Sequence, residues 1–303
     1  AHDAAPRVPI ERETAMESTA NARQEDFNFV QELAKDLSAG SLDLPSFPDI
    51  VAKIRRVLAD ENCTVDQIVQ ILGAEPGLAA RIVNMANSAA LGPAADPITD
   101  LRMAVNRIGF NMVRNSTMSY GVSQTQSAYT LKESRKVLDS LWDECAHVAA
   151  LCFVLAKGYT KLNPDEALLV GLMHGIGKLY ILGRADKHPE LFNDQSSLDQ
   201  VMEQWHAAIG SAIIQNWGFE SYFAFAIENY RNYEREHGES ADYTDVLTLA
   251  CLFSQFIRSE SDMEVQLDGI PASKQLSIGT ADMIPIIQSS NNQVNSLRRA
   301  LGK

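Results

Sequence analysis

His174 is a titratable side chain within an apolar stretch, residues 168–182, and Gly175 and Gly177 follow it closely. Imidazole nitrogens are common ligands of zinc and iron, so one interpretation is a ligand in a buried metal site. The alternative is a core histidine that bonds to a neighbouring helix, with the glycines allowing close packing. Both interpretations place the His174 ring in the protein interior.

A metal site needs further donors, and two other apolar segments offer them. Glu144 lies in the stretch LWDECAHVAAL, and His206 lies in the stretch EQWHAAIG. Together with His174 they supply the donor types of a facial triad, although spacing alone does not tell whether the three side chains meet. His147 follows Glu144 by three residues, and Lys178 shares a helical stripe with His174. These residues are the candidates for site chemistry.

The elements that must position these side chains are predicted to be helices throughout. Apolar residues recur at helical spacing, and convincing strand alternation is missing, so the sequence predicts an all-α fold. We expect a polar tail over 1–26, a subdomain of short helices over 27–125, and a bundle of longer helices with a C-terminal helical closure over 139–303. The polar stretch 122–137 is the predicted internal boundary, and residues 261–279 are predicted to be loop-like.

Several helix ends are marked by local signals. Capping boxes predict helix starts at Thr64–Gln67 and at Ser197–Gln200. Asn163 is predicted to cap a single helix that continues through His174. Gly109 and Gly121 are predicted to end two helices in the first half of the chain.

Composition excludes some classes of partner. The formal charge is −13, and the contiguous basic groupings are only two residues long, so neither nucleic acid nor an anionic membrane surface is expected as a partner. No run of about 18 apolar residues or signal peptide is seen. The four cysteines form no C-x-x-C pair, so we expect free thiols, no cofactor and a cytoplasmic location.

A second group of polar residues lies on one predicted helix: Arg81, Asn84, Asn87 and Ser88. One hypothesis is a docking face for a partner protein. The alternative is structural, because asparagine near a helix end often binds the backbone of a neighbouring loop. The sequence alone does not distinguish the docking face from the structural role.

The motifs together resemble those of the HDOD domain, a bacterial signalling module. The stretches LPSFPDIVAKI, GAEPGLAARIVNMANSAALG and LRMAVNRIGFNMVRN resemble its first half. The stretches DEALLVGLMHGIGK, HAAIG and NWGF resemble its second half, so the resemblance covers roughly residues 42–300. One departure is the short gap between Glu203 and His206, where the family usually has a longer connection.

HDOD domains resemble HD-type metal phosphohydrolases that have lost part of their metal site. By this resemblance, Glu144 stands where the first metal-binding histidine would be, and His174 keeps the second one. Gly175 stands where the paired aspartate would be, and His206 matches the next histidine. The later positions fall on Asn229 or Tyr230 and near Cys251.

The resemblance implies a fold of short helices packed on an HD-like bundle, with a vestigial site at Glu144, His174, Gly175, Lys178 and His206. Without a carboxylate at position 175, two cations lose a bridging ligand, so we expect no bound metal and no catalysis. The implied function is a non-catalytic signal-transduction module acting through protein–protein interaction. Implied partners include a response regulator, a diguanylate cyclase or a phosphodiesterase.

Two alternatives stay open. The chain could be a metal-dependent phosphohydrolase or cyclic-nucleotide phosphodiesterase, with Glu144, His174 and His206 as its metal ligands. It could also be a sensor that binds a small ligand, such as a nucleotide, in the vacated pocket.

Overall fold

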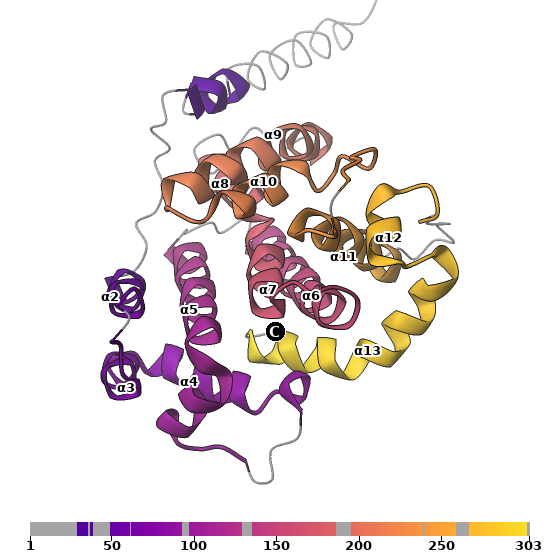
Figure 1. Cartoon of the computed structure of the whole chain (residues 1–303). Helices are drawn as coiled ribbons and strands as arrows, with labels where there is room; N and C mark the ends of the chain where they lie inside the picture. The colour runs from indigo at the N-terminus through magenta and orange to yellow at the C-terminus, as the bar shows by residue number, and fades with distance from the viewer. Residues whose placement is uncertain are drawn as a thin grey trace, which may run out of the picture.

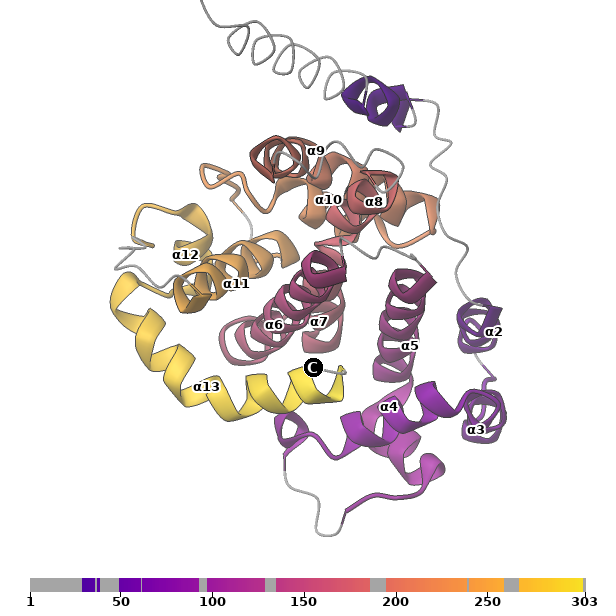
Figure 2. The same ribbon diagram turned by 180° about the vertical axis from the view of Figure 1, so that it is seen from behind.

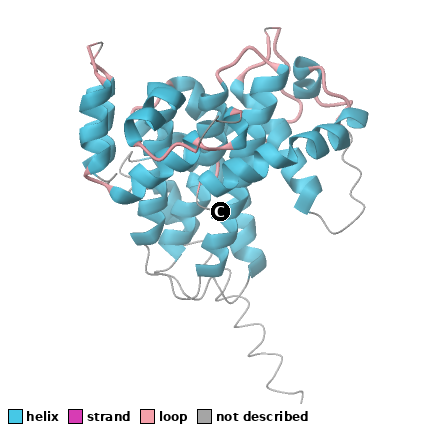
Figure 3. Cartoon of the chain, turned by 90° about the horizontal axis from the view of Figure 1, so that it is seen from below, coloured by secondary structure: helices cyan, strands magenta, loops and turns pink. Residues whose placement is uncertain are grey.

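The structure is a computed structural model in which every described residue belongs to a helix or to the turns between helices. No strand occurs in this part of the chain (Figure 3), so the all-α prediction is confirmed. The predicted tail over 1–26 lies outside the described residues. These comprise 29–35, 37–38, 49–60, 62–92, 97–128, 135–185, 195–238, 240–258 and 267–301.

A layer of short helices precedes the bundle: α2 (Asp49–Leu58), α3 (Val65–Gly73), α4 (Pro76–Ala86), the 3-10 turn η1 (Ala89–Leu91) and the long α5 (Leu101–Ala128). The capping box that begins α3 is confirmed, since the Thr64 N–H donates to Gln67 Oε1 over 2.9 Å and the Gln67 N–H donates back to Thr64 Oγ1 over 3.4 Å. Helix α5 contacts α2, α3 and α4 and also α7, so it connects this layer to the bundle (Figure 1).

Helix α5 contains the predicted break at Gly109. Its backbone there has φ 75° and ψ 167°, a region that essentially only glycine occupies without strain. The predicted end at Gly121 is wrong, because α5 continues to Ala128. A glycine within a helix costs only about 1 kcal/mol, and the burial of this turn of α5 outweighs that cost. The predicted boundary over 122–137 is therefore helical at both ends.

The described part of the bundle contains the helices α6 (Arg135–Tyr159), α7 (Pro164–Met173), α8 (Ile176–Ala185), α9 (Gln195–Asn216), α10 (Ser221–Asn229) and α11 (Tyr243–Arg258). Helices α6 and α7 pack against each other at the centre of the molecule (Figure 2). Asn163 caps α7 as predicted, because its Oδ1 accepts the Asp165 N–H over 3.0 Å. The segment Pro164–Ala185 is long and apolar enough to cross a membrane, yet 83% of its apolar window is buried inside the fold. Its apolarity is therefore that of a core segment.

Two predicted features of the bundle are wrong. The single helix expected through His174 is interrupted there, since α7 ends at Met173 and α8 begins at Ile176. Gly175 and Gly177 weaken the helix at this point, and close packing against other helices fixes the turn. The capping box at Ser197–Gln200 does not begin α9, which starts at Gln195. Serine and glutamine are tolerated in a first helical turn, so the helix extends past the capping pattern.

Two helices close the C-terminal end: α12 (Pro271–Leu276) and α13 (Thr280–Ala300). Helix α12 lies within the stretch that was predicted to be loop-like. Helix α13 contacts α6 of the bundle and also α4 and η1 of the N-terminal layer (Figure 1). The C-terminal closure therefore joins both parts of the molecule, whereas the sequence assigned it to the bundle alone.

Candidate functional site

Three of the predicted site residues line one cavity of about 360 Å³ within the bundle. Glu144 comes from α6, His174 from the turn between α7 and α8, and Lys178 from α8. The remaining lining residues come from α6, α9, α11 and the end of α10: Val148, Glu203, Tyr230, Arg231, Cys251, Ser254, Gln255 and Arg258.

Glu144 is a carboxylate with two basic neighbours. Lys178 Nζ donates to Glu144 Oε1 over 3.2 Å, and His174 Nε2 lies 4.0 Å from the same oxygen. Burial alone would raise the pKa of Glu144, but His174 and Lys178 outweigh it and hold this pKa well below its usual range. Glu144 is therefore ionised at neutral pH, and the Lys178 ammonium balances its charge.

His174 is oriented by the backbone of its own helix. Its Nδ1 lies 2.6 Å from the Gly171 carbonyl oxygen. A carbonyl only accepts, so Nδ1 carries a proton and donates it. Nε2 is then the ring nitrogen directed towards Glu144, and it is the atom that a ligand in the cavity would meet.

His206 is hydrogen-bonded at both ring nitrogens. Nδ1 donates to the Met202 carbonyl over 2.6 Å, which leaves Nε2 to accept the Tyr230 hydroxyl over 2.7 Å. Burial and the nearby Lys178 cation lower the pKa of His206 to about 4, so the ring is neutral at pH 7. Burial also raises the pKa of Tyr230 well above its usual value, which keeps the hydroxyl protonated. The lone pair on His206 Nε2, which a metal would need, therefore already accepts the hydrogen bond from Tyr230.

Position 175 borders a different region from the cavity. A Cβ atom at Gly175 would lie 2.4 Å from Cys145 Sγ and 3.2 Å from Leu141 Cδ1. A contact below 3.0 Å requires a neighbour to move, so a side chain here would push against α6. The space that a carboxylate would need is filled by Cys145, whose pKa burial raises to about 12. A neutral thiol therefore occupies this space.

The predicted metal ligands do not fit a two-metal centre. Within the described ranges, the ligand atoms of Glu144, His174 and His206 do not all lie within 4.8 Å of one another. Glu144 is paired with an ammonium group, and the free nitrogen of His206 accepts a hydroxyl. Two cations also need bridging oxygen ligands, and position 175 offers none. The structure thus brings Glu144, His174 and Lys178 to one cavity, while Gly175 and His206 do not line it, and the set does not have the arrangement of a metal site.

A second cluster was not predicted, although its ligand atoms do lie within 4.8 Å of one another: His237, Asp242 and Asp245. Arg235 donates to Asp242 Oδ1 over 2.7 Å and to Asp245 Oδ1 over 2.8 Å, and His237 Nε2 lies 2.9 Å from Asp245 Oδ2. The Asp242 carboxylate also accepts the Thr244 N–H at the start of α11. These carboxylates are neutralised and bonded within the chain, so the cluster is a structural start for α11.

The predicted docking face is partly used for internal contacts. Arg81 donates to Ser119 Oγ over 3.1 Å and to the Leu301 carbonyl over 2.9 Å. Burial lowers the pKa of Arg81 to about 10, and its guanidinium remains charged at neutral pH. Asn84, one turn further along α4, is exposed.

The other two residues of that face have partners as well. Asn87 Nδ2 donates to the Ile98 carbonyl over 2.7 Å, and its Oδ1 accepts the Ile98 N–H over 2.9 Å. The Ser88 hydroxyl lies 3.0 Å from the Ser296 hydroxyl of α13. These contacts are of the structural kind considered as the alternative, and the docking hypothesis remains a prediction.

The sequence did not decide between Asn229 and Tyr230, and it did not indicate the ion pair at the cavity wall. Tyr230 lines the cavity, whereas Asn229 binds a carbonyl of its own helix, so Tyr230 is the residue that meets the site. Cys251 lines the cavity near its expected place. The ion pair of Arg231 with Glu203 at the cavity wall was missed. The arginine directly after Tyr230 was an available signal, but a charge next to a helix end is usually solvated.

The all-helical architecture and its histidine-centred cavity define an HD-like helical protein. The model of the HDOD domain family matches residues 44–233, which is more than half of the chain. The chain therefore belongs to the HDOD domain family. The matched range begins where the motifs predicted but ends earlier than the expected residue 300, so α11, α12 and α13 lie beyond it. Among curated proteins no relative matches.

Solved structures share the fold over nearly the whole chain. A Shewanella amazonensis protein, named provisionally as a metal-dependent phosphohydrolase, is 23% identical with a TM-score of 0.78, covering 92% of this chain and 99% of its own. A Geobacter sulfurreducens HDOD domain protein of unknown function is 22% identical with a TM-score of 0.67, covering 90% and 97%. A Marinobacter aquaeolei protein, named provisionally for signal transduction, is 17% identical with a TM-score of 0.60, covering 92% and 66%. At these identities the likeness concerns the fold alone.

Proposed function

We propose that this HDOD chain is a non-catalytic signal-transduction module that acts through protein–protein contact. The proposal is supported by two features of the HD-like site, which concern a potential metal ligand and the space beside position 175. His206 Nε2 accepts the Tyr230 hydroxyl over 2.7 Å, and the space beside Gly175 is filled by Cys145. A hydrolase of this class needs metal-bound water, and these two features work against holding the metal.

A metal and turnover assay tests the absence of catalysis. The purified protein is incubated with Mn²⁺, Fe²⁺ or Zn²⁺, desalted, and assayed for bound metal and for hydrolysis of phosphomonoesters and cyclic nucleotides. We expect far less than one metal per chain and no turnover above the buffer. Near-stoichiometric metal, with turnover abolished by His174→Ala, would overturn the proposal.

A Gly175→Asp variant sharpens this test. If a lost carboxylate were the only defect, the substitution would restore metal binding. Because the new side chain would meet Cys145 Sγ, we expect a loss of stability and no gain of metal. Adding Cys145→Ala makes room for the carboxylate. If the double variant regains stability but still binds no metal, the steric clash is not what prevents metal binding.

The proposed partners are signalling proteins such as a response regulator, a diguanylate cyclase or a phosphodiesterase. The family membership supports a signalling role, and the net charge of −13 argues against nucleic acid as the partner. The four free cysteines, three of them buried, support a reducing cytoplasmic location. Affinity capture from the native cell, followed by mass spectrometry, tests the interaction. Recovery of nucleic acid alone, with no signalling protein, would contradict it.

A small-ligand sensor is the second candidate, favoured by one observation. The cavity beside His174 is about 360 Å³ and is lined by Glu144, Lys178 and Arg231, which offer charges of both signs. Thermal shift against nucleotides, compared with a Lys178→Met variant, tests this candidate. Stabilisation that the variant abolishes would favour the sensor.

A further inference from the structure

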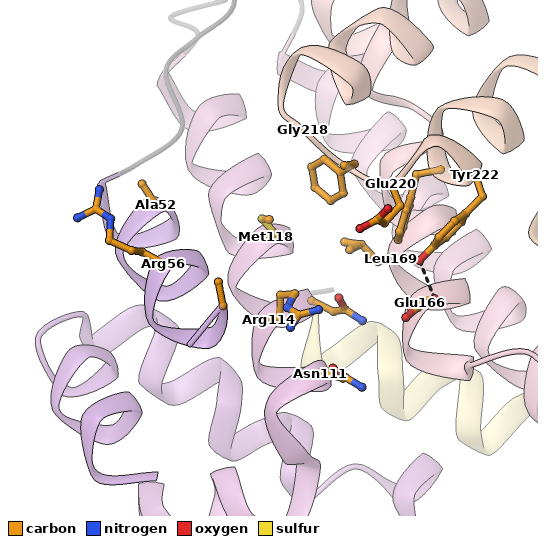
Figure 4. Close-up of a pocket in the computed structure, with 14 residues that line it drawn as sticks. Ala52, Arg56, Asn111, Arg114, Met118, Glu166, Leu169, Gly218, Glu220 and Tyr222 are labelled. Carbon is orange, nitrogen blue, oxygen red and sulfur yellow. Dashed lines mark hydrogen bonds between the residues drawn. The ribbon is translucent and has the colours of Figure 1, made fainter. Parts of the chain in front are cut away.

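A cleft of about 550 Å³, larger than the vestigial cavity, lies between the N-terminal layer and the bundle (Figure 4). Its volume is within the range of roughly 300–1,000 Å³ that is typical of small-ligand sites. One wall is formed by α2 and α5, and the other by α7 and the start of α10. No part of the vestigial site lines it.

The α5 wall carries two donor side chains, Arg114 and Asn115. Arg114 lies along this wall, whereas the guanidinium of Arg56 on α2 points away from α5 and α10 (Figure 4). Neither arginine has a hydrogen bond or an ion pair with any residue that the structure describes. In a chain with a formal charge of −13, an arginine on the cleft wall that has no acidic partner among the described residues is a local source of positive potential.

Asn115 adds an independent sign of a missing ligand. Its side chain lines the cleft and is only 3% exposed, yet its Nδ2 has no hydrogen-bond partner among the described residues. A buried polar group without a partner is energetically costly. A ligand that accepts a hydrogen bond here would remove that cost.

The opposite wall is aromatic. Tyr222 stacks on Phe223 with ring centroids 4.8 Å apart and on Tyr243 with centroids 5.1 Å apart. Glu166 accepts the hydroxyls of Tyr222 and Tyr243 over 2.8 Å and 2.7 Å, which fixes both rings. Phe219 extends the same wall. Such a surface suits a flat ring.

One carboxylate on this wall has no ion pair with any residue that the structure describes. Glu220 precedes α10, makes no capping bond with its side chain, and is exposed at the cleft (Figure 4). No ion pair joins it to Arg114 across the described cleft. The site thus offers a cationic donor, a flat apolar surface and a carboxylate acceptor.

We propose that this cleft binds a guanine nucleotide. Arg114, assisted by Asn115, binds the phosphate, and the base lies against the Phe219 and Tyr222 surface. The Glu220 carboxylate accepts the two adjacent N–H groups of guanine. Adenine presents a nitrogen acceptor beside its amino group, so it repels this carboxylate.

Ligand in this cleft would contact both α5 and α10. Binding would therefore favour one arrangement of the N-terminal layer on the bundle, which supplies an input for the signalling role. The proposal goes beyond the interaction function: a failure to bind nucleotide leaves that function intact, and a failure to bind protein partners leaves this site intact.

Isothermal titration of the full chain with GMP tests the proposal, with AMP, guanosine and inorganic phosphate as comparison ligands. We expect GMP to bind about tenfold or more tightly than each of the others, because only GMP offers both the phosphate and the guanine edge that donates two hydrogen bonds to Glu220. Arg114→Ala should weaken GMP binding by at least about tenfold. Glu220→Gln should remove the preference for GMP over AMP.

The matched control is Arg102→Ala on the same helix. Arg102 pairs with Asp66 away from the cleft, so its loss should leave GMP affinity unchanged. Circular dichroism checks that each variant is folded, and Glu220 is exposed enough to be replaced safely. No heat of binding at millimolar GMP, or equal losses in Arg102→Ala and Arg114→Ala, would overturn the site. Equal affinity for AMP and GMP would overturn the guanine assignment.

Discussion

The Tyr230 hydroxyl determines what the His206 ring can do. Because Nδ1 donates to the Met202 carbonyl, Nε2 has a lone pair that only a donor or a metal can satisfy. Tyr230 supplies the donor from the end of α10 and is itself 5% exposed. The ring is thereby held as part of the core, in a neutral state.

Tyr230→Phe should destabilise the protein by about 1–3 kcal/mol, because it leaves His206 Nε2 buried without a donor. Urea unfolding followed by circular dichroism measures the change. The matched control is Tyr159→Phe at a side chain that is 41% exposed, where we expect a change within about 0.5 kcal/mol. Equal unfolding midpoints for the two variants would show that the bond to His206 contributes nothing.

Residue types in the sequence pointed to the candidate side chains, and the family resemblance grouped them into one site. Glu144, His174 and Lys178 line one cavity, because titratable residues in apolar helices must face a polar region. The role of Cys145 was not predictable, since it depends on how closely α6 approaches position 175. Tyr230 remained one of two choices because a shift of one residue at a helix end reverses which side chain points inward.

Among the helices, the contact of α8 with α9 sets the position of His206. A Cβ at Gly177 would lie 1.9 Å from the His206 carbonyl oxygen and 2.9 Å from the Gly210 nitrogen. The two backbones therefore touch, which only glycine at this position permits. This contact explains the second glycine after His174 as a packing requirement.

Gly177→Ala should destabilise the protein by roughly 3 kcal/mol or more, because backbone atoms of α9 have to move. Gly158→Ala is the matched control, since a Cβ there meets nothing within 4 Å at the exposed end of α6. That control should stabilise by roughly 0.5–1 kcal/mol through helix propensity. Unfolding free energies of both variants are compared, and a neutral Gly177→Ala would contradict the backbone contact.

Helix boundaries were predictable where a side chain itself makes the cap. Thr64 and Asn163 both form their predicted bonds. The pattern failed where tertiary packing decides, as at Gly121 within α5 and at Ser197 within α9. Helix α12 escaped prediction because a six-residue helix carries too little periodicity to be distinguished from a turn.

For the whole molecule, two buried histidines predict a loss of stability in mild acid. Burial is the main cause that lowers the pKa values of His206 and His147 to about 4, from the usual value of 6.5. Below pH 6.5 the unfolded chain takes up protons that the folded protein refuses until about pH 4. Stability should therefore fall by ~3 kcal/mol between pH 6.5 and pH 5, because the slope of each histidine rises from half to nearly all of ~1.4 kcal/mol per pH unit over this range.

Urea unfolding at half-unit pH steps measures this fall. Glu144 has its pKa lowered and loses its contribution only as pH falls below about 4.5, so it does not enter the same window. The double variant His147→Gln with His206→Gln should flatten the curve between pH 6.5 and 5. An unchanged slope in that variant would assign the acid sensitivity to other groups.

The joining of the two parts by the C-terminal helix could not be read from the sequence. Arg81 bonds to the Leu301 carbonyl across 220 positions, and Ser88 bonds to Ser296 across 208. Local patterns carry no information on such pairs, which depend on the path of the whole chain. The sequence therefore predicted a subdomain of short helices packed on a bundle, without the connection that α13 makes between them.

Arg81→Met tests whether this connection or a docking face explains the polar residues of α4. Methionine keeps much of the buried stem but removes the donors to Ser119 and Leu301, so we expect a loss of roughly 2 kcal/mol in unfolding free energy. Asn84→Ala on the same helix is exposed and should change stability by less than about 0.5 kcal/mol. If Arg81→Met were neutral in stability while capture of a partner fell, the docking hypothesis would hold. A loss of stability with capture retained in the Asn84→Ala variant would assign α4 to holding the C-terminal helix in place.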